Sequence, residues 1–458
     1  MMKKTFGNSS ISRLPSLLYN REREEIEHNA EKILIGKLYR TVELKVDSGK
    51  LCVSYAENSK ERDFYLDMEH SAHICLFAQT GGGKTFIITR AAASFYLSGK
   101  GVFFISDIKD EMKSIANPRL KKYDAYVPVK NEFTEKSTGI PVAVLRPPYL
   151  NEAEGIKMPK DEIDSRMYLP TMTATTLLSI CGISQGNEDK TGMTSILIDT
   201  LEQELKKGNI KTTADLEAFF TDEEKTKGYN KNTKESIRLK LKNAITKGVI
   251  TDNPAYNRSI AEYLNNKIVP ILNLKGYRDA GFNSAGVEVA TRIGEIRSGR
   301  TNNKIKDKLL MVIDEAHAFC PENEKEQSIS RKAIIDLIRI ARSMGISMAF
   351  LSQIDEKSFG IPPLIVKQCR YVFLSSNTSI QILRKVLRLF NMYTYDNSKE
   401  DFGISPESTF VEYVFNGARK VWDAKTKPRT PWYVIDSKTS TISLVWIYSP
   451  PCAVPEEM

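Results

Sequence analysis

Residues 76–85, LFAQTGGGKT, constrain the fold of this chain most, because an apolar run breaks into three glycines and ends in Lys-Thr. The preceding residues suit a buried parallel strand, and those from Thr85 onward favour a helix. Glycines between them let backbone N–H groups converge on an anion without Cβ interference, and the helix N-terminus adds its positive dipole end. The pattern therefore predicts a phosphate-binding loop between a strand and a helix.

The residues that we expect to bind the nucleotide are Thr80, Gly81, Gly82, Gly83, Lys84 and Thr85. Lys84 would reach the β- and γ-phosphates of ATP, and the Thr85 hydroxyl would ligate Mg²⁺. Ala78 stands where the G-x-x-x-x-G-K-[ST] pattern has its first glycine, and alanine fits this turn if its φ is negative. The alternative is a plain glycine turn between a strand and a helix, which the following Lys-Thr pair disfavours.

The charge balance favours a polyanionic partner. Lysine and arginine exceed aspartate and glutamate by 66 − 57 = 9 in 458 residues, although the excess is spread along the chain. The cysteines are scattered without a C-x-x-C pair, which favours a reducing compartment and argues against a zinc site. Because neither a signal-peptide pattern nor a bilayer-length apolar run is found, we expect a cytoplasmic protein without a membrane span.

The order of the patterns predicts an α/β fold with a mainly parallel sheet, since strand and helix patterns alternate around the phosphate loop. In the middle of the chain the apolar residues take on helical spacing, and Thr212 with Asp215 resembles a capping box. The expected parts are an N-terminal arm (1–30), a small β domain (31–68), a core (69–149 and 265–435), a helical insertion (150–264) and a C-terminal tail (436–458).

A second apolar strand, 309–313, delivers Asp314 and Glu315 at its carboxyl end. In a parallel sheet this end faces the nucleotide, so Asp314 can complete the Mg²⁺ shell beside Thr85, while Glu315 can deprotonate the attacking water. The alternative is a strand that happens to end in two acidic residues, and the upstream phosphate loop disfavours this alternative.

Further candidates follow this strand. Gln353 ends another predicted strand, where its amide could contact the γ-phosphate. Arg339 and Arg342 share a face of the preceding helix and could stabilise transition-state charge across a subunit boundary, or could simply pair with acids. Two basic segments, a flexible loop at 297–308 and the lysine-rich 225–247, could contact nucleic acid, although solvated surface is the commoner role.

Together these motifs resemble the HerA/FtsK superfamily of P-loop ATPases, and most closely HerA-type DNA translocases and helicases. Asp107 with Glu111 is similar to the family's Asp-x-x-x-Glu, and residues 314–321 (DEAHAFCP) match its Asp-Glu-Ala-His-x-Phe-x-Pro. Residues 340–346 (IARSMGI) followed by LSQ match its arginine helix and sensor strand. Motifs in this order are far more specific than the phosphate loop alone.

The resemblance covers residues 33–110 and 265–435 and implies a RecA-like core. It implies a homo-hexameric ring around double-stranded DNA, with ATP and Mg²⁺ bound between subunits and an arginine supplied in trans. The chain would then be an ATP-hydrolysing DNA translocase used in end processing, genome packaging, transfer or defence. Its small β domain resembles a barrel on which a nuclease or other effector docks. An alternative of another class is an ATP-binding ring scaffold or regulatory subunit with little translocation; a kinase or small GTPase is disfavoured.

Overall fold

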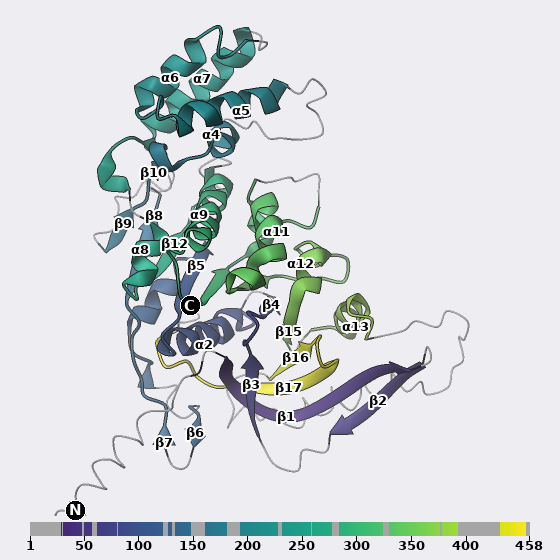
Figure 1. The fold of residues 1–458 in the computed structure, drawn as a ribbon. Helices are drawn as coiled ribbons and strands as arrows, with labels where there is room; N and C mark the ends of the chain where they lie inside the picture. The colour runs from purple at the N-terminus through teal and green to yellow at the C-terminus, as the bar shows by residue number, and fades with distance from the viewer. Residues whose placement is uncertain are drawn as a thin grey trace, which may run out of the picture.

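The computed structural model describes most of the chain (Figure 1). Thr80 of the phosphate loop and almost all of the predicted N-terminal arm lie outside the described residues. The described residues are 29, 31–47, 50–56, 62–79, 81–121, 127–130, 133–147, 161–180, 193–227, 231–257, 259–276, 284–323, 329–375, 378–392 and 431–454.

A parallel sheet forms the centre of the molecule, with neighbouring strands in the order β15-β4-β14-β13-β5-β12-β8-β9. Strands such as β13 are apolar at every position because both faces of the sheet are covered. The predicted α/β fold with a mainly parallel sheet is confirmed. The strands are β4 (His73–Phe77), β5 (Gly101–Asp107), β8 (Val142–Arg146), β9 (Glu162–Asp164), β12 (Val269–Asn273), β13 (Leu309–Ile313), β14 (Ile346–Ser352) and β15 (Cys369–Ser375).

Antiparallel strands continue the same sheet beyond β15 in the order β16-β17-β1-β2, and β3 also pairs with β1. Asp47 pairs with Lys50, where β1 ends and β2 begins. Gly36 pairs with Ile447, so segments from the predicted β domain and the predicted tail share one sheet; the division into domains stays a prediction. These strands are β1 (Lys32–Asp47), β2 (Lys50–Ala56), β3 (Arg62–Asp67), β16 (Trp432–Asp436) and β17 (Thr441–Ile447).

Two apolar layers cover the sheet, because successive side chains of a strand point to opposite faces. Phe103 and Met311 lie in one layer, and Phe104 and Val312 in the other. The layer of Phe104 holds α2 (Lys84–Leu97), the helix that follows the phosphate loop. The layer of Phe103 holds α8 (Ile260–Asn265), α9 (Ser284–Thr301), α11 (Ile329–Ala341), α12 (Pro363–Gln368) and α13 (Ile380–Leu389).

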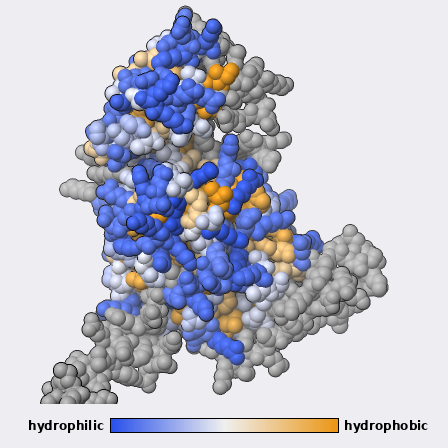
Figure 2. Space-filling view, viewed as in Figure 1, coloured by the Kyte–Doolittle hydropathy of each residue, from blue (hydrophilic) through white to orange (hydrophobic). Residues whose placement is uncertain are grey.

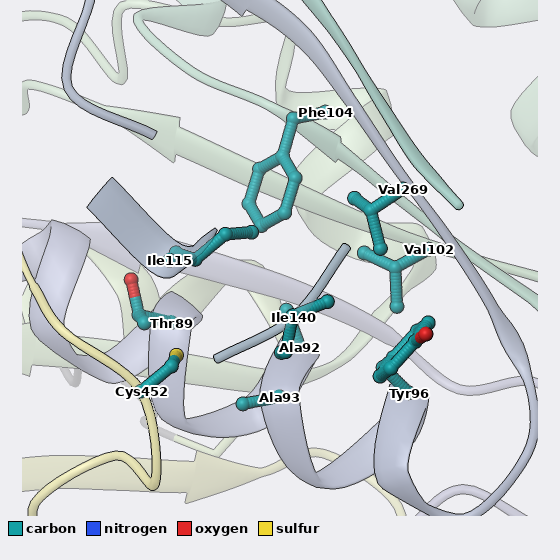
Figure 3. A pocket seen from close by; sticks show the side chains of 10 residues that line it. All are labelled: Thr89, Ala92, Ala93, Tyr96, Val102, Phe104, Ile115, Ile140, Val269 and Cys452. Carbon is teal, nitrogen blue, oxygen red and sulfur yellow. The ribbon is translucent and has the colours of Figure 1, made fainter. Parts of the chain in front are cut away.

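Helix α2 packs closely against its face of the sheet. A crevice between α2 and strands β5 and β12 is lined mostly by apolar side chains, and Cys452 from the C-terminal segment is also among its lining residues (Figure 3). It leaves no room for a water molecule. We therefore interpret it as a packing contact that fixes α2, and with it the phosphate loop, on the sheet.

A helical lobe lies at one end of the molecule and contacts the core through α4 and α9 (Figure 1). The capping box at its α6 is confirmed: the Thr212 hydroxyl accepts the Asp215 N–H at 3.1 Å, and the Asp215 carboxylate accepts the Thr212 N–H at 2.9 Å. Hydrophilic side chains cover most of the lobe's visible face (Figure 2). Its helices are α4 (Ala174–Ile180), α5 (Met193–Lys206), α6 (Thr213–Thr221) and α7 (Lys231–Thr246).

The prediction of a flexible basic loop at 297–308 is wrong in its first part, because α9 continues to Thr301. The Arg300 guanidinium donates to the carbonyl oxygens of Ile305 at 2.9 Å and Gly345 at 2.8 Å. These bonds tie the end of α9 to the start of β14. Of the helices in the described ranges, none has the length and apolar character needed to cross a membrane.

Candidate functional site

The phosphate loop connects β4 to α2, and its glycines meet specific steric demands. Gly81 and Gly83 have φ values of 74° and 85°, in the left-handed region that favours glycine. A Cβ on Gly82 would lie only 2.6 Å from the Cβ of Ala78. Ala78 itself does not adopt a positive φ, which is the condition for an alanine at this turn. Ala78 therefore fits the loop because Gly82 leaves room for it.

Lys84, the first residue of α2, folds back over the loop. Its ammonium donates to the carbonyl oxygens of Ala78 at 2.8 Å and Gln79 at 3.4 Å. Burial lowers the pKa of Lys84, whereas the carboxylates of Glu315 and Asp314 act to raise it. The ammonium is thus close to the acidic residues of the site and is held by neutral carbonyl groups that an anion could replace.

Carboxylates converge at the same edge of the sheet, since β14 alone separates β4 from β13. Asp314 and Glu315 follow β13, and Asp107 ends the neighbouring β5. All three are buried. Burial raises the pKa of Asp314 to about 7, and the nearby charges of Glu315 and Asp107 add to this shift. The site therefore concentrates negative charge that a bound cation would stabilise.

Glu315 has an unusual backbone conformation, with φ 43° and ψ 48°. A glutamate in this left-handed region costs about 1 kcal/mol or more, and such strain clusters at functional sites. Lys109 Nζ lies 3.4 Å from Oε1, and His317 Nδ1 lies 3.4 Å from Oε2. The Glu315 side chain is only 9 % exposed, and a basic group lies beside each of its carboxylate oxygens.

Gln353 follows the last residue of β14, at the edge where the phosphate loop and the Asp-Glu pair lie. Because β14 lies between β4 and β13, Gln353 extends from the strand between these two groups. Its side chain is exposed, so the amide is accessible to a ligand bound at this edge.

Arg339 and Arg342 lie near the opposite edge of the sheet, because α11 leads back to the amino end of β14. The Arg342 guanidinium donates to the carbonyl of Gln368, immediately before β15 begins. Arg339 is 58 % exposed and lies 3.9 Å from Asp336. Neither arginine is therefore brought to the phosphate loop of its own chain.

The side chains present fit Mg²⁺. Thr85 offers a hydroxyl oxygen and Asp314 a carboxylate oxygen, and hard oxygen ligands are those that Mg²⁺ prefers. Burial and the nearby charges of Glu315 and Asp107 raise the pKa of Asp314, which disfavours its negatively charged form. A cation bound beside Asp314 would stabilise this negatively charged form.

Reasoning from the sequence missed two contacts at the site. Lys109, between Asp107 and Glu111, pairs with Glu315; its position in the Asp-x-Lys-x-Glu segment was the available signal. Trp432 lies over the loop, with its ring 3.8 Å from the point where a Gly83 Cβ would stand. No local sequence pattern predicts this contact, because Trp432 belongs to β16, which is distant from the loop in the sequence.

The glycine loop with its lysine, the Asp-Glu strand and the parallel sheet define a P-loop NTPase. Residues 49–293 match the family model for the central domain of the helicase HerA, which is more than half of the 458 residues. The chain therefore belongs to the HerA family, within the HerA/FtsK superfamily of P-loop ATPases, as its motifs predicted.

Solved structures similar to this chain include VirB4 of Thermoanaerobacter pseudethanolicus, at 12 % identity and a TM-score of 0.48, over 90 % of this chain and 96 % of that one. The bacterial conjugative coupling protein TrwBdeltaN70 aligns at 13 % identity and a TM-score of 0.43, over 69 % and 73 %. The genome packaging NTPase B204 of Sulfolobus turreted icosahedral virus 2 aligns at 14 % identity and a TM-score of 0.23, over 43 % and 73 %. No curated protein sequence matches the chain.

Proposed function

We propose that this chain is an ATP-hydrolysing, Mg²⁺-dependent motor that moves double-stranded DNA as a homo-hexameric ring. One observation carries the proposal: the phosphate loop with Lys84 and the buried pair Asp314 and Glu315 converge at one edge of the sheet. Membership of the HerA family supports it further.

In this proposal Thr80, the three glycines and Lys84 bind the phosphates of ATP, since left-handed glycines direct backbone N–H groups toward an anion. Lys84 exchanges its carbonyl contacts for phosphate oxygens. Thr85 and Asp314 hold Mg²⁺, which when bound neutralises charge on the phosphates. Glu315 accepts a proton from the attacking water, and Gln353 contacts the γ-phosphate.

The positions of Arg339 and Arg342 support their use across a subunit boundary. Both lie away from the nucleotide edge of their own chain, and Arg339 is exposed. A guanidinium supplied by a neighbour would stabilise charge in the transition state, so that hydrolysis requires an assembled ring. The proposal assigns this role to Arg342 or Arg339.

The net charge of +9 is consistent with a DNA partner. DNA-end processing, genome packaging, transfer and defence would all use the same motor, and a nuclease or other effector could dock on the N-terminal strands. A cytoplasmic location remains the expectation from the sequence.

The test is the ATPase rate with and without linear duplex DNA, on protein whose mass in solution is measured by light scattering. A hexamer stimulated several-fold by DNA is expected. Slow turnover by a ring that ignores DNA would instead support an ATP-binding scaffold or regulatory subunit. A monomer that neither binds nor hydrolyses ATP would refute the proposal.

A further inference from the structure

A short turn after β5 carries a lysine into the carboxylate cluster. The Asp107 carboxylate closes this turn by accepting two backbone N–H groups further along it, at 3.1 and 2.9 Å. Asp110, with a left-handed φ of 60°, anchors the turn to β12, because its carboxylate accepts the Asn273 amide at 2.9 Å. Lys109 therefore extends from backbone that is held on both sides.

Lys109 faces Glu315 across the edge of the sheet. Its ammonium lies 3.4 Å from Glu315 Oε1, and the two side chains are 34 % and 9 % exposed. Burial acts to lower the pKa of Lys109, but the charges of Glu315, Asp314 and Glu111 outweigh it and raise this pKa. Lys109 is therefore cationic at neutral pH, while the other lysine of the site, Lys84, is held by loop carbonyls.

An ammonium paired with the carboxylate of a general base opposes its function, because it occupies an oxygen that would otherwise accept a proton from water. A triphosphate carries more negative charge than one carboxylate and would compete for the same ammonium. The Lys109 stem is flexible and partly exposed, so the ammonium can change partners without moving the anchored turn.

We propose that Lys109 pairs with Glu315 while the site is empty and moves to the γ-phosphate when ATP binds. The glutamate is then freed to activate water only when a triphosphate is present. Lys109 is in this way both a phosphate-binding residue and a restraint on the base. The inference rests on the proposed ATPase function and adds to it a means of distinguishing ATP from ADP.

Lys113 offers a matched control. It lies in the short 3-10 helix that follows the turn, residues Met112–Ala116, is 39 % exposed, and pairs with Asp110 at 2.9 Å rather than with Glu315. Loss of its charge changes the local charge by the same amount as loss of Lys109, without removing the contact to the base.

The first measurement is equilibrium binding of a non-hydrolysable ATP analogue and of ADP, each with Mg²⁺, to the full chain. Lys109→Met should reduce the preference for triphosphate over diphosphate roughly tenfold, the value of one charge-assisted contact. Lys109→Arg should recover part of that preference, and Lys113→Met should match the wild type. An unchanged preference in Lys109→Met would overturn the γ-phosphate contact.

The second measurement needs no nucleotide. Thermal unfolding of Lys109→Met, Glu315→Gln and the double variant forms a cycle in which paired residues give non-additive shifts. We expect the double variant to lose less than the sum of the single losses, and additive shifts would overturn the pairing. A wild-type chain that binds neither nucleotide would refute the proposed function and the phosphate half of this inference, while the cycle still decides the pairing.

Discussion

Replacing Gly82 by alanine tests the geometry of the phosphate loop directly. The added Cβ would lie 2.6 Å from the Ala78 Cβ and 3.0 Å from the Gln79 carbonyl oxygen. Carbon atoms pack at about 3.5–4.0 Å, so the loop must open by about 1 Å. Because Gly82 has no positive φ, the effect comes from space rather than from backbone strain. Overpacking of this kind costs about 1–3 kcal/mol, which would weaken nucleotide binding roughly 5- to 150-fold.

The assay is titration with a fluorescent ATP analogue, with thermal unfolding as a control for folding. Adding Ala78→Gly to Gly82→Ala removes the closer clash and should recover part of the affinity, while the Gln79 contact remains. The reasoning would be refuted if Gly82→Ala bound the analogue like the wild type, or if Ala78→Gly gave no rescue. Either result would show that the space left by Gly82 is not what allows an alanine at position 78.

Three further outcomes are expected. Glu315→Gln should retain ATP binding and lower turnover by about 100-fold or more, because the amide cannot accept the proton; hydrolysis at the parental rate would show that another group is the base. Lys84→Ala and the double variant Arg339→Ala/Arg342→Ala should each be inactive alone, yet regain part of the activity when mixed, since a mixed ring contains interfaces with an intact loop and intact arginines; no recovery would argue against a role in trans. His73 is buried and accepts the Met348 N–H at 3.0 Å, and burial lowers its pKa to about 3. The unfolded chain therefore binds a proton below about pH 6.5 that the folded chain does not, so stability falls as the pH is lowered toward 3, by up to about 1.4 kcal/mol per unit. Urea unfolding between pH 6 and 4 should show the free energy of unfolding falling more steeply with decreasing pH for the wild type than for His73→Gln. Equal slopes would show that His73 is not the group responsible for this pH dependence.

Local patterns were sufficient to predict the elements that carry the site. The strand before the phosphate loop, the Asp314-Glu315 strand and the strand that precedes Gln353 all form as predicted. Each is a short run of apolar residues next to a polar terminus, and the rule that parallel strands present their carboxyl ends together then brings the groups into one place.

Contacts between distant segments could not be read in this way. Thr41 bonds Ser443 across 402 residues of sequence, and nothing in either segment specifies that partner. The end of α9 was predicted as a loop because basic residues with Gly and Asn favour loops, whereas tertiary bonds from Arg300 override that preference. The pairing of Lys109 with Glu315 depends on the turn closed by Asp107, which only the folded sheet defines.

The position of β4 in the sheet affects the order of events during synthesis. Its neighbours β14 and β15 come much later in the chain, and Cys75 of β4 contacts Cys369 of β15 across 294 residues. The strand that carries the phosphate loop is therefore translated long before either neighbour exists. The nucleotide site should thus mature only when most of the chain has left the ribosome, and until then an apolar strand with two unpaired edges is a target for chaperones and for aggregation.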